Sequence, residues 1–194
     1  MSERAIGAVL AGGASTLIGE PKALVGLAGR PMIAHVVAAV AEAGLEPIVI
    51  AKPDSPVPPL DALVLDEPAE PRHPLLGIAV ALRYSAGRPV IVVGCEMPLV
   101  PPALLAGLAR LEDSIAVVEI DGELQPLLAR YTSAVEPVLK EGLAERRPLR
   151  EVVAGLLPRV IAGDELAAYG DPNRIGFSVN SPSDLELARS LLER

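Results

Sequence analysis

Short apolar runs rich in valine and isoleucine alternate along this chain with longer segments rich in alanine and leucine. Five runs have the length of buried strands, at residues 6–10, 47–51, 62–66, 89–94 and 114–120. The intervening segments at residues 31–44, 74–85 and 101–110 are predicted to be helical, and Pro31 and Gly44 delimit the first of them as they delimit helices. Because strands that alternate with helices usually pair in parallel, the pattern predicts an α/β fold. We expect three α/β/α layers around a mostly parallel, Rossmann-like sheet.

The alternation loosens after Asp121-Gly122, a dipeptide typical of hairpin turns. Beyond it the sequence predicts a strand and two short extended segments, at residues 123–131, 159–163 and 177–180. Helices are expected at residues 132–145, 147–156 and 181–194. Ser181 stands at the N-cap position of the last helix. We find no repeat or linker in the sequence, so we expect a single domain over residues 1–194.

Composition excludes several classes of function. The net charge of −8 disfavours binding to nucleic acid or to an anionic membrane, and aromatic residues for base stacking make up only 2% of the chain. No apolar stretch approaches the length of a membrane span, and no signal segment precedes the first strand. Cys95 is the single cysteine, which excludes an internal disulfide. We therefore expect a cytoplasmic protein without a nucleic-acid or membrane partner.

A glycine-rich loop follows the first predicted strand, in the sequence LAGGASTLIGEPKAL at residues 10–24. Gly12 and Gly13 allow backbone N–H groups to converge on an anion, and Lys22 adds a mobile positive charge. The spacing matches neither the dinucleotide motif GxGxxG nor the Walker motif GxxxxGK[ST]. The loop therefore predicts a phosphate site of another kind.

Other polar and glycine residues follow the remaining predicted strands. They are Lys52 to Asp54, Asp66, Gly94 to Met97 and Asn180. Ligands of open α/β sheets bind beyond the carboxyl ends of the strands. We therefore expect these residues to gather with the glycine loop at one edge of the sheet.

The loop resembles the signature LAGGxSxRMGxDKxL of the molybdenum cofactor guanylyltransferase (MobA-type) family of nucleotidyltransferases. The matching positions are Leu10, Ala11, Gly12, Gly13, Ser15, Gly19, Lys22 and Leu24. The resemblance continues in order through GRPMIAHV, PLLGIAVAL, VVGCEMPLV, QPLLARY, RPLREVV and FSVNSPSDL. It covers essentially the whole chain, which makes it more specific than the loop alone.

The resemblance implies transfer of GMP from GTP to the phosphate of a molybdopterin-type cofactor, with release of pyrophosphate and with Mg²⁺ as the cofactor. It implies a nucleotide-binding half at about residues 1–100 and an acceptor-side half at about residues 101–194. Lys22 and Glu96 would be catalytic, with Glu96 also the metal ligand. The implied nucleotide-binding residues are Leu10, Ala11, Gly12, Gly13, Lys22, Lys52, Asp66 and Glu96. Gln125 and Asn180 would lie on the acceptor side. Homo-oligomers and contacts with molybdoenzymes or cofactor-maturation proteins are further implied partners.

Three positions depart from the family pattern. Leu17 replaces the arginine of the loop, Pro21 replaces the aspartate before the lysine, and Glu96 replaces the aspartate of CDMP. An arginine elsewhere in the sequence, such as Arg72, Arg83 or Arg174, could substitute for the lost positive charge. One alternative is therefore a catalytically weakened or inactive protein that binds a nucleotide or cofactor. The other is a transferase that uses CTP or another phosphorylated acceptor, although LAGG favours guanine over the LAAG of the cytidine branch.

Three further residues are expected to be structural. His35 lies within an apolar helical segment and predicts a packed, hydrogen-bonded core side chain. His73 follows several prolines, where we expect a surface residue. Cys95 directly follows an apolar strand and predicts a small buried filler rather than a nucleophile.

Overall fold

A seven-stranded mixed sheet forms the centre of the computed structural model, which describes residues 4–13 and 20–193. In space the strands follow the order β5-β4-β1-β6-β8-β7-β9. Their bounds are β1 Ile6–Leu10, β4 Glu46–Ala51, β5 Leu63–Asp66, β6 Val90–Gly94, β7 Ile115–Ile120, β8 Glu123–Tyr131 and β9 Arg159–Ile161. Strands β5, β4, β1 and β6 are mutually parallel, whereas β8 runs antiparallel to both β6 and β7. The mostly parallel sheet is confirmed.

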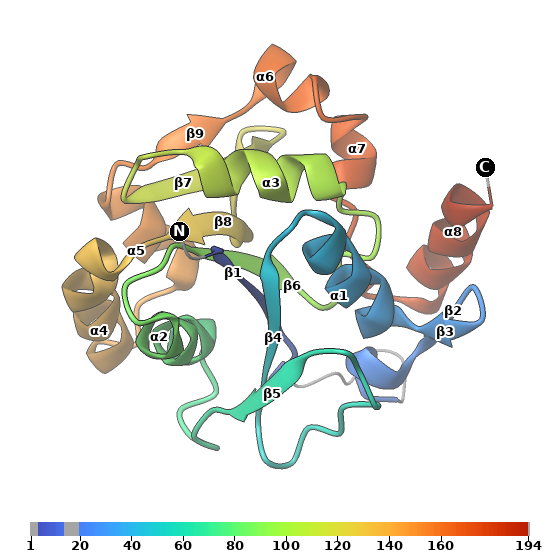
Figure 1. Cartoon of the computed structure of the whole chain (residues 1–194), viewed down its shortest axis with the longest axis horizontal. Coiled ribbons are helices and arrows are strands. Elements are labelled where there is room, and N and C mark those ends of the chain that lie inside the picture. Colours follow the sequence, from blue (N-terminus) through green and yellow to red (C-terminus); the bar gives the residue numbers. More distant parts are fainter. Residues whose placement is uncertain (1–3, 14–19, 194) are drawn as a thin grey trace.

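Helices cover both faces of the sheet. Their bounds are α1 Met32–Glu42, α2 Pro74–Ser85, α3 Pro102–Arg110, α4 Glu136–Ala144, α5 Leu149–Gly155, α6 Gly163–Ala167, α7 Pro172–Ile175 and α8 Pro182–Leu192. Figure 1 shows α2, α4 and α5 on one side of the sheet, with α1 on the other. The small ribbon of β2 (Gly26–Leu27) and β3 (Arg30–Pro31) lies beside α8.

Two apolar cores flank the sheet because successive strand side chains point to opposite faces. Val9 and Val49 pack into the core that includes α1 and α3, whereas Ala8 and Ile48 pack into the core with α2, α4 and α5. Strands covered on both faces read as unbroken apolar runs, which explains why their positions were predictable. Within the described residues, no helix is long and apolar enough to cross a membrane.

The C-terminal half differs from the prediction in three places. The extended segment expected at residues 177–180 is irregular, because its backbone bonds include Val179 N to Glu96 O rather than a strand ladder. Helices α6 and α7, which were not predicted, are short, with five and four residues. The segment expected as one helix at 132–145 begins with a 3₁₀ turn, η2 (Ser133–Val135), before α4. Ser181 caps α8 by accepting from the backbone N–H of Asp184, as predicted.

Candidate functional site

A cavity of about 340 Å³ opens at the carboxyl ends of the parallel strands, where the predicted polar residues were expected to meet. Six predicted site residues line it: Leu10, Gly12, Gly13, Lys22, Lys52 and Glu96. They come from segments after β1, β4 and β6, which the parallel register aligns at one edge: Leu10 pairs with Ile50 on one side and with Gly94 on the other. The sheet thus brings together residues up to 86 positions apart, since both Leu10 and Glu96 line the cavity.

Four predicted site residues lie outside this lining. Ala11 lines an adjoining cavity of about 180 Å³, which shares Gly13, Lys22 and Arg72 with the first. Asp66 is exposed on β5, and Gln125 lies on β8 with its amide donating to the Glu123 carbonyl. Asn180 lines neither cavity, but its Oδ1 accepts a hydrogen bond from Lys22, which lines both. Ser15, Leu17 and Gly19 of the signature fall outside the described residues.

Lys22 joins the glycine loop to the C-terminal segment. It begins a 3₁₀ turn, η1 (Lys22–Leu24), and its Nζ donates to Oδ1 of Asn180 at 2.6 Å. The backbone N–H of Asn180 in turn donates to the Asp184 carboxylate at 2.9 Å, an interaction that lowers the pKa of Asp184. Lys22 therefore lies where it reaches both the cavity and a residue predicted for the acceptor side.

Lys52 is buried, and its Nζ contacts three oxygen atoms of the protein. Its Nζ donates to the carbonyls of Pro68 at 2.8 Å and Pro71 at 3.4 Å, and it lies 3.4 Å from Oε1 of Glu67. Only 2% of the side chain is exposed. An ammonium group has three hydrogens to donate, so these contacts use its capacity. The side chain holds the loop after β5 and a carboxylate in place, and a direct bond to phosphate would break one of these contacts.

Glu67 is the site residue that sequence reasoning missed. Its carboxylate lies between the glycine loop and α2, where a Cβ on Gly12 would come within 2.0 Å of Oε1 and one on Gly77 within 3.2 Å of Oε2. In the described part of the chain, Oε2 is buried without a hydrogen-bond partner. Burial raises the pKa of Glu67, and the charge of Lys52 opposes that rise. A signal was present: Glu67 directly follows β5 and its N–H still bonds to the Ala51 carbonyl of the neighbouring strand, so extended-chain alternation turns Asp66 and Glu67 opposite ways.

Removing the positive charge from this pair should destabilise the fold. Lys52→Met is expected to lower the free energy of unfolding by about 3 kcal/mol at pH 8, because it leaves a buried carboxylate unpaired. A carboxyl group whose pKa is raised in the folded state costs stability as the pH rises from its unfolded-state pKa to that raised pKa. The loss should therefore shrink at pH 5, where Glu67 can take up a proton. Urea unfolding at both values, with K52M/E67Q as the matched control, measures this; an equal loss at both would contradict it.

Glu96 follows β6 and is the second carboxylate of the cavity. Among the described residues no three His, Cys, Asp or Glu side chains are grouped as a metal site of their own. Mg²⁺ in nucleotide enzymes is commonly held by one or two carboxylates together with substrate phosphates and water. A half-buried carboxylate that lines the same cavity as Lys22 and the glycine loop fits that kind of site.

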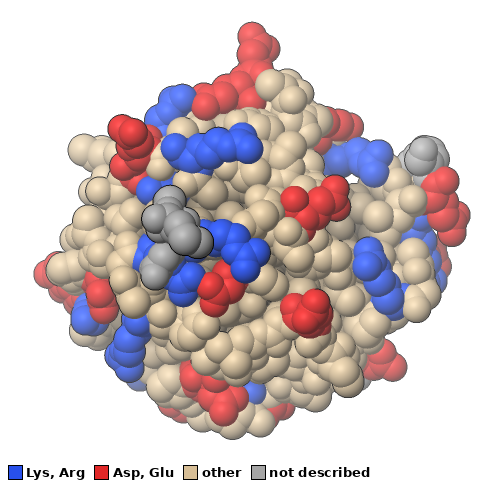
Figure 2. Space-filling view, viewed as in Figure 1, with Lys and Arg blue, Asp and Glu red and all other residues tan. Residues whose placement is uncertain are grey.

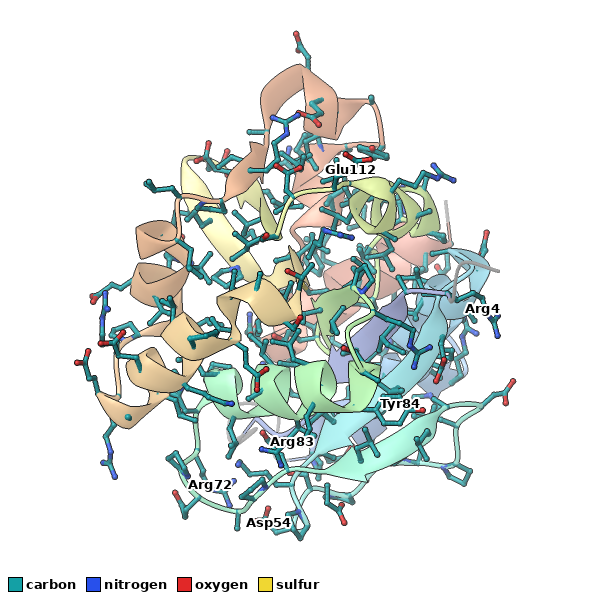
Figure 3. All side chains as sticks on the ribbon, turned by 60° about the vertical axis from the view of Figure 1, so that its left-hand side comes forward. Arg4, Asp54, Arg72, Arg83, Tyr84 and Glu112 are labelled. Atoms are coloured by element: carbon teal, nitrogen blue, oxygen red, sulfur yellow. The ribbon has the colours of Figure 1, made fainter. Side chains whose placement is uncertain are left out.

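Arg72 brings a further positive charge to the cavity. It lines both cavities from the loop before α2, and its guanidinium pairs with Asp54 and lies 3.7 Å from Glu70. The hydrogen bond from Arg72 lowers the pKa of Asp54. Figure 3 shows Arg72 and Asp54 close together on the loops at one end of the molecule. Elsewhere, on the face shown in Figure 2, basic and acidic side chains are interspersed.

The two histidines have structural roles, one of them unexpected. His35 is buried and contacts the Leu27 carbonyl through Nε2 at 2.8 Å, as predicted for a core residue; burial lowers its pKa. The surface position predicted for His73 is wrong. Its ring is half-buried, accepts from the Leu75 N–H at the start of α2, and contacts the Arg147 carbonyl at 2.9 Å. Cys95 is buried in the apolar core, as predicted.

Comparison with known proteins assigns this arrangement to a family. The model of the MobA-like NTP transferase domain matches residues 7–160, which include every residue named above in the cavity. The chain belongs to this family. It is 30% identical over 193 residues to a probable molybdenum cofactor guanylyltransferase of Pelotomaculum thermopropionicum, covering 98% of this chain and 94% of the relative. It is 34% identical over 179 residues to the molybdenum cofactor guanylyltransferase of Pseudomonas putida, covering 86% and 93%.

The fold of this family member also matches a solved structure. The molybdopterin-guanine dinucleotide biosynthesis protein A of Archaeoglobus fulgidus superposes with a TM-score of 0.79, covering 96% of this chain and 98% of that chain. At 21% sequence identity the match establishes the shared nucleotidyltransferase fold. The predicted family and fold class are both confirmed.

Proposed function

We propose that this chain transfers GMP from GTP to the phosphate of a molybdopterin-type cofactor and releases pyrophosphate. One observation carries the proposal: the glycine loop, Lys22 and Glu96 line a single cavity at the carboxyl edge of the sheet. The choice of substrates follows the names of the relatives, which are molybdenum cofactor guanylyltransferases. The acceptor phosphate is already an anion, so the reaction depends on positioning and charge stabilisation more than on a general base.

Each residue has a definable task in this reaction. The N–H groups of the glycine loop hold the nucleotide, and Lys22 stabilises the negative charge that spreads over the α-phosphate and the leaving pyrophosphate. Glu96 would hold Mg²⁺, which supplies Lewis-acid stabilisation of the phosphate oxygens when bound. Asn180 is bonded to Lys22, and that contact supports a role for it on the acceptor side.

Glu67 gives the proposal its base preference. Guanine presents two adjacent donors, N1–H and the 2-amino group, to an acceptor in its plane. Oε2 of Glu67 is a buried acceptor whose hydrogen-bonding capacity is unused within the described residues, and Lys52 keeps the carboxylate in place. A buried acceptor left unpaired costs free energy, so a nucleotide that donates to it is favoured. This supports GTP over a nucleotide without such donors.

Arg72 is the arginine best placed to replace the cation lost at Leu17. It lines the cavity with Lys22, whereas Arg83 is exposed on α2 and Arg174 donates to the Leu191 carbonyl near the C-terminus. Arg72→Gln is expected to lower turnover by about 100-fold and to weaken inhibition by pyrophosphate, because one phosphate-gripping charge is removed. Arg83→Gln on the same loop–helix unit is the matched control (Figure 3). Equal effects of the two variants would contradict this role.

The proposal is tested with purified protein, GTP, molybdopterin and Mg²⁺. Pyrophosphate release and formation of the guanine dinucleotide cofactor are expected together, with CTP in place of GTP giving neither. GTP binding by calorimetry without pyrophosphate release would instead support a nucleotide-binding protein that has lost turnover. Turnover with CTP alone would assign the chain to the cytidine branch.

A further inference from the structure

The Glu96 carboxylate is folded back over Gly94, two positions earlier in the chain. If residue 94 carried a Cβ, its three nearest neighbours would be Oε1, Cδ and Oε2 of Glu96, at 2.7, 2.9 and 3.1 Å. Side-chain Cβ atoms do not approach other atoms under 3.0 Å without displacing them. The observed position of this carboxylate therefore requires glycine at residue 94.

The backbone conformation of Gly94 does not itself demand glycine. Its φ lies outside the positive range in which other residues are strained, and it is the last residue of the buried strand β6, paired with Leu10. An alanine could adopt this backbone. A larger residue at position 94 would therefore displace the Glu96 carboxylate, which is the end of a flexible side chain, rather than the backbone.

Two further contacts hold Glu96, one at its carboxylate and one at its backbone carbonyl. The Cys95 thiol donates to Oε2 of Glu96 across 3.6 Å, and the Glu96 backbone carbonyl accepts from the N–H of Val179 at 2.9 Å. The side chain is thus held at its tip and the backbone at its carbonyl, in a residue that lines the cavity.

We propose that Gly94 is a positioning residue that allows a glutamate to hold the metal at this site. The signature that the chain resembles has aspartate at position 96, one methylene shorter. Folding the longer side chain back over a residue without Cβ keeps its carboxylate near the end of β6 and compensates for the extra methylene. The inference rests on the proposed function, because it takes Glu96 as the metal ligand.

Gly94→Ala should weaken Mn²⁺ binding in the presence of GTP by about 10- to 100-fold, the usual effect of removing support from a metal ligand. Free Mn²⁺ is measured by electron paramagnetic resonance. In the E96D background the same change should have little effect, since an aspartate does not reach back over residue 94. Gly155→Ala, at a glycine with no heavy atom within 4 Å of the added Cβ, is the matched control.

A crystal structure of the G94A protein gives a second measurement. It tests the inference even if the E96D protein binds Mn²⁺ too weakly for the comparison of backgrounds. We expect the Glu96 carboxylate to have moved away from residue 94. A carboxylate that stays in place, or an equal loss of Mn²⁺ binding in both backgrounds, would overturn the inference. The E96Q variant tests the proposed function separately: Mn²⁺ binding at the parent level would remove Glu96 from the metal site, whatever the G94A structure shows.

Discussion

Lys22→Met is expected to lower kcat/KM for guanylyl transfer by about 100- to 1,000-fold, the usual cost of removing one group that stabilises transition-state charge. Lys22 is the lysine of the glycine loop, and its Nζ is bonded to Asn180 at the mouth of the cavity. Methionine keeps the length and apolar stem of the side chain. The loss should therefore fall mainly on kcat, with a smaller change in GTP affinity.

Lys140→Met is the matched control for this variant. Lys140 is an exposed lysine of α4, paired with Glu136 one turn earlier, and it does not line either cavity described above. Both variants should unfold at nearly the parent temperature, because neither lysine is buried. If Lys22→Met retained the parent kcat, the glycine loop would be a structural turn and the reaction would need another cation.

The fold was largely predictable because burial on both faces leaves a strong signal. Strands such as β1 and β6 read as short apolar runs, and the segments between the strands carry the helical pattern. The C-terminal segment around residue 177 carried no such signal, because its bonds run to the backbone of residue 96 rather than to a strand. Short helices such as α6 contain too few turns to show a period.

The site was predictable in part for a different reason. Residues identified from a signature, such as Lys22 and Glu96, do line the cavity, because the strand ends that carry them are brought together by the sheet. Glu67 was missed because side chains of an extended segment alternate in direction, so a shift of one position at the end of a strand exchanges the buried side chain for the exposed one. Asp66 was the more conspicuous position, and it is exposed. The resting place of Glu96 depends on a contact with Gly94 that spacing alone could not show.

Base recognition gives the second large expected effect. Glu67→Gln should lower the affinity for GTP by about 10- to 100-fold, because a hydrogen bond to a charged acceptor contributes about 1.5–3 kcal/mol. Inosine triphosphate, which lacks the 2-amino group of guanine, tests the contact directly. The parent protein should prefer GTP over ITP, and the preference should largely disappear in the variant. Competition binding with a fluorescent guanine nucleotide measures both ratios.

Glu67 also pairs with Lys52, so a loss of folding has to be separated from a loss of recognition. Glutamine keeps the shape of the side chain between Gly12 and Gly77, and the melting temperature reports any change in stability. The K52M/E67Q protein, which lacks both charges, should show the same loss of preference for GTP over ITP as E67Q. If E67Q lowered the affinities for GTP and ITP equally, the substitution would act through the shape of the cavity and not through a hydrogen bond to the base. If a folded E67Q protein kept the parent's ratio of GTP affinity to ITP affinity, Oε2 of Glu67 would not accept a hydrogen bond from the guanine 2-amino group. The base would then be recognised by other residues.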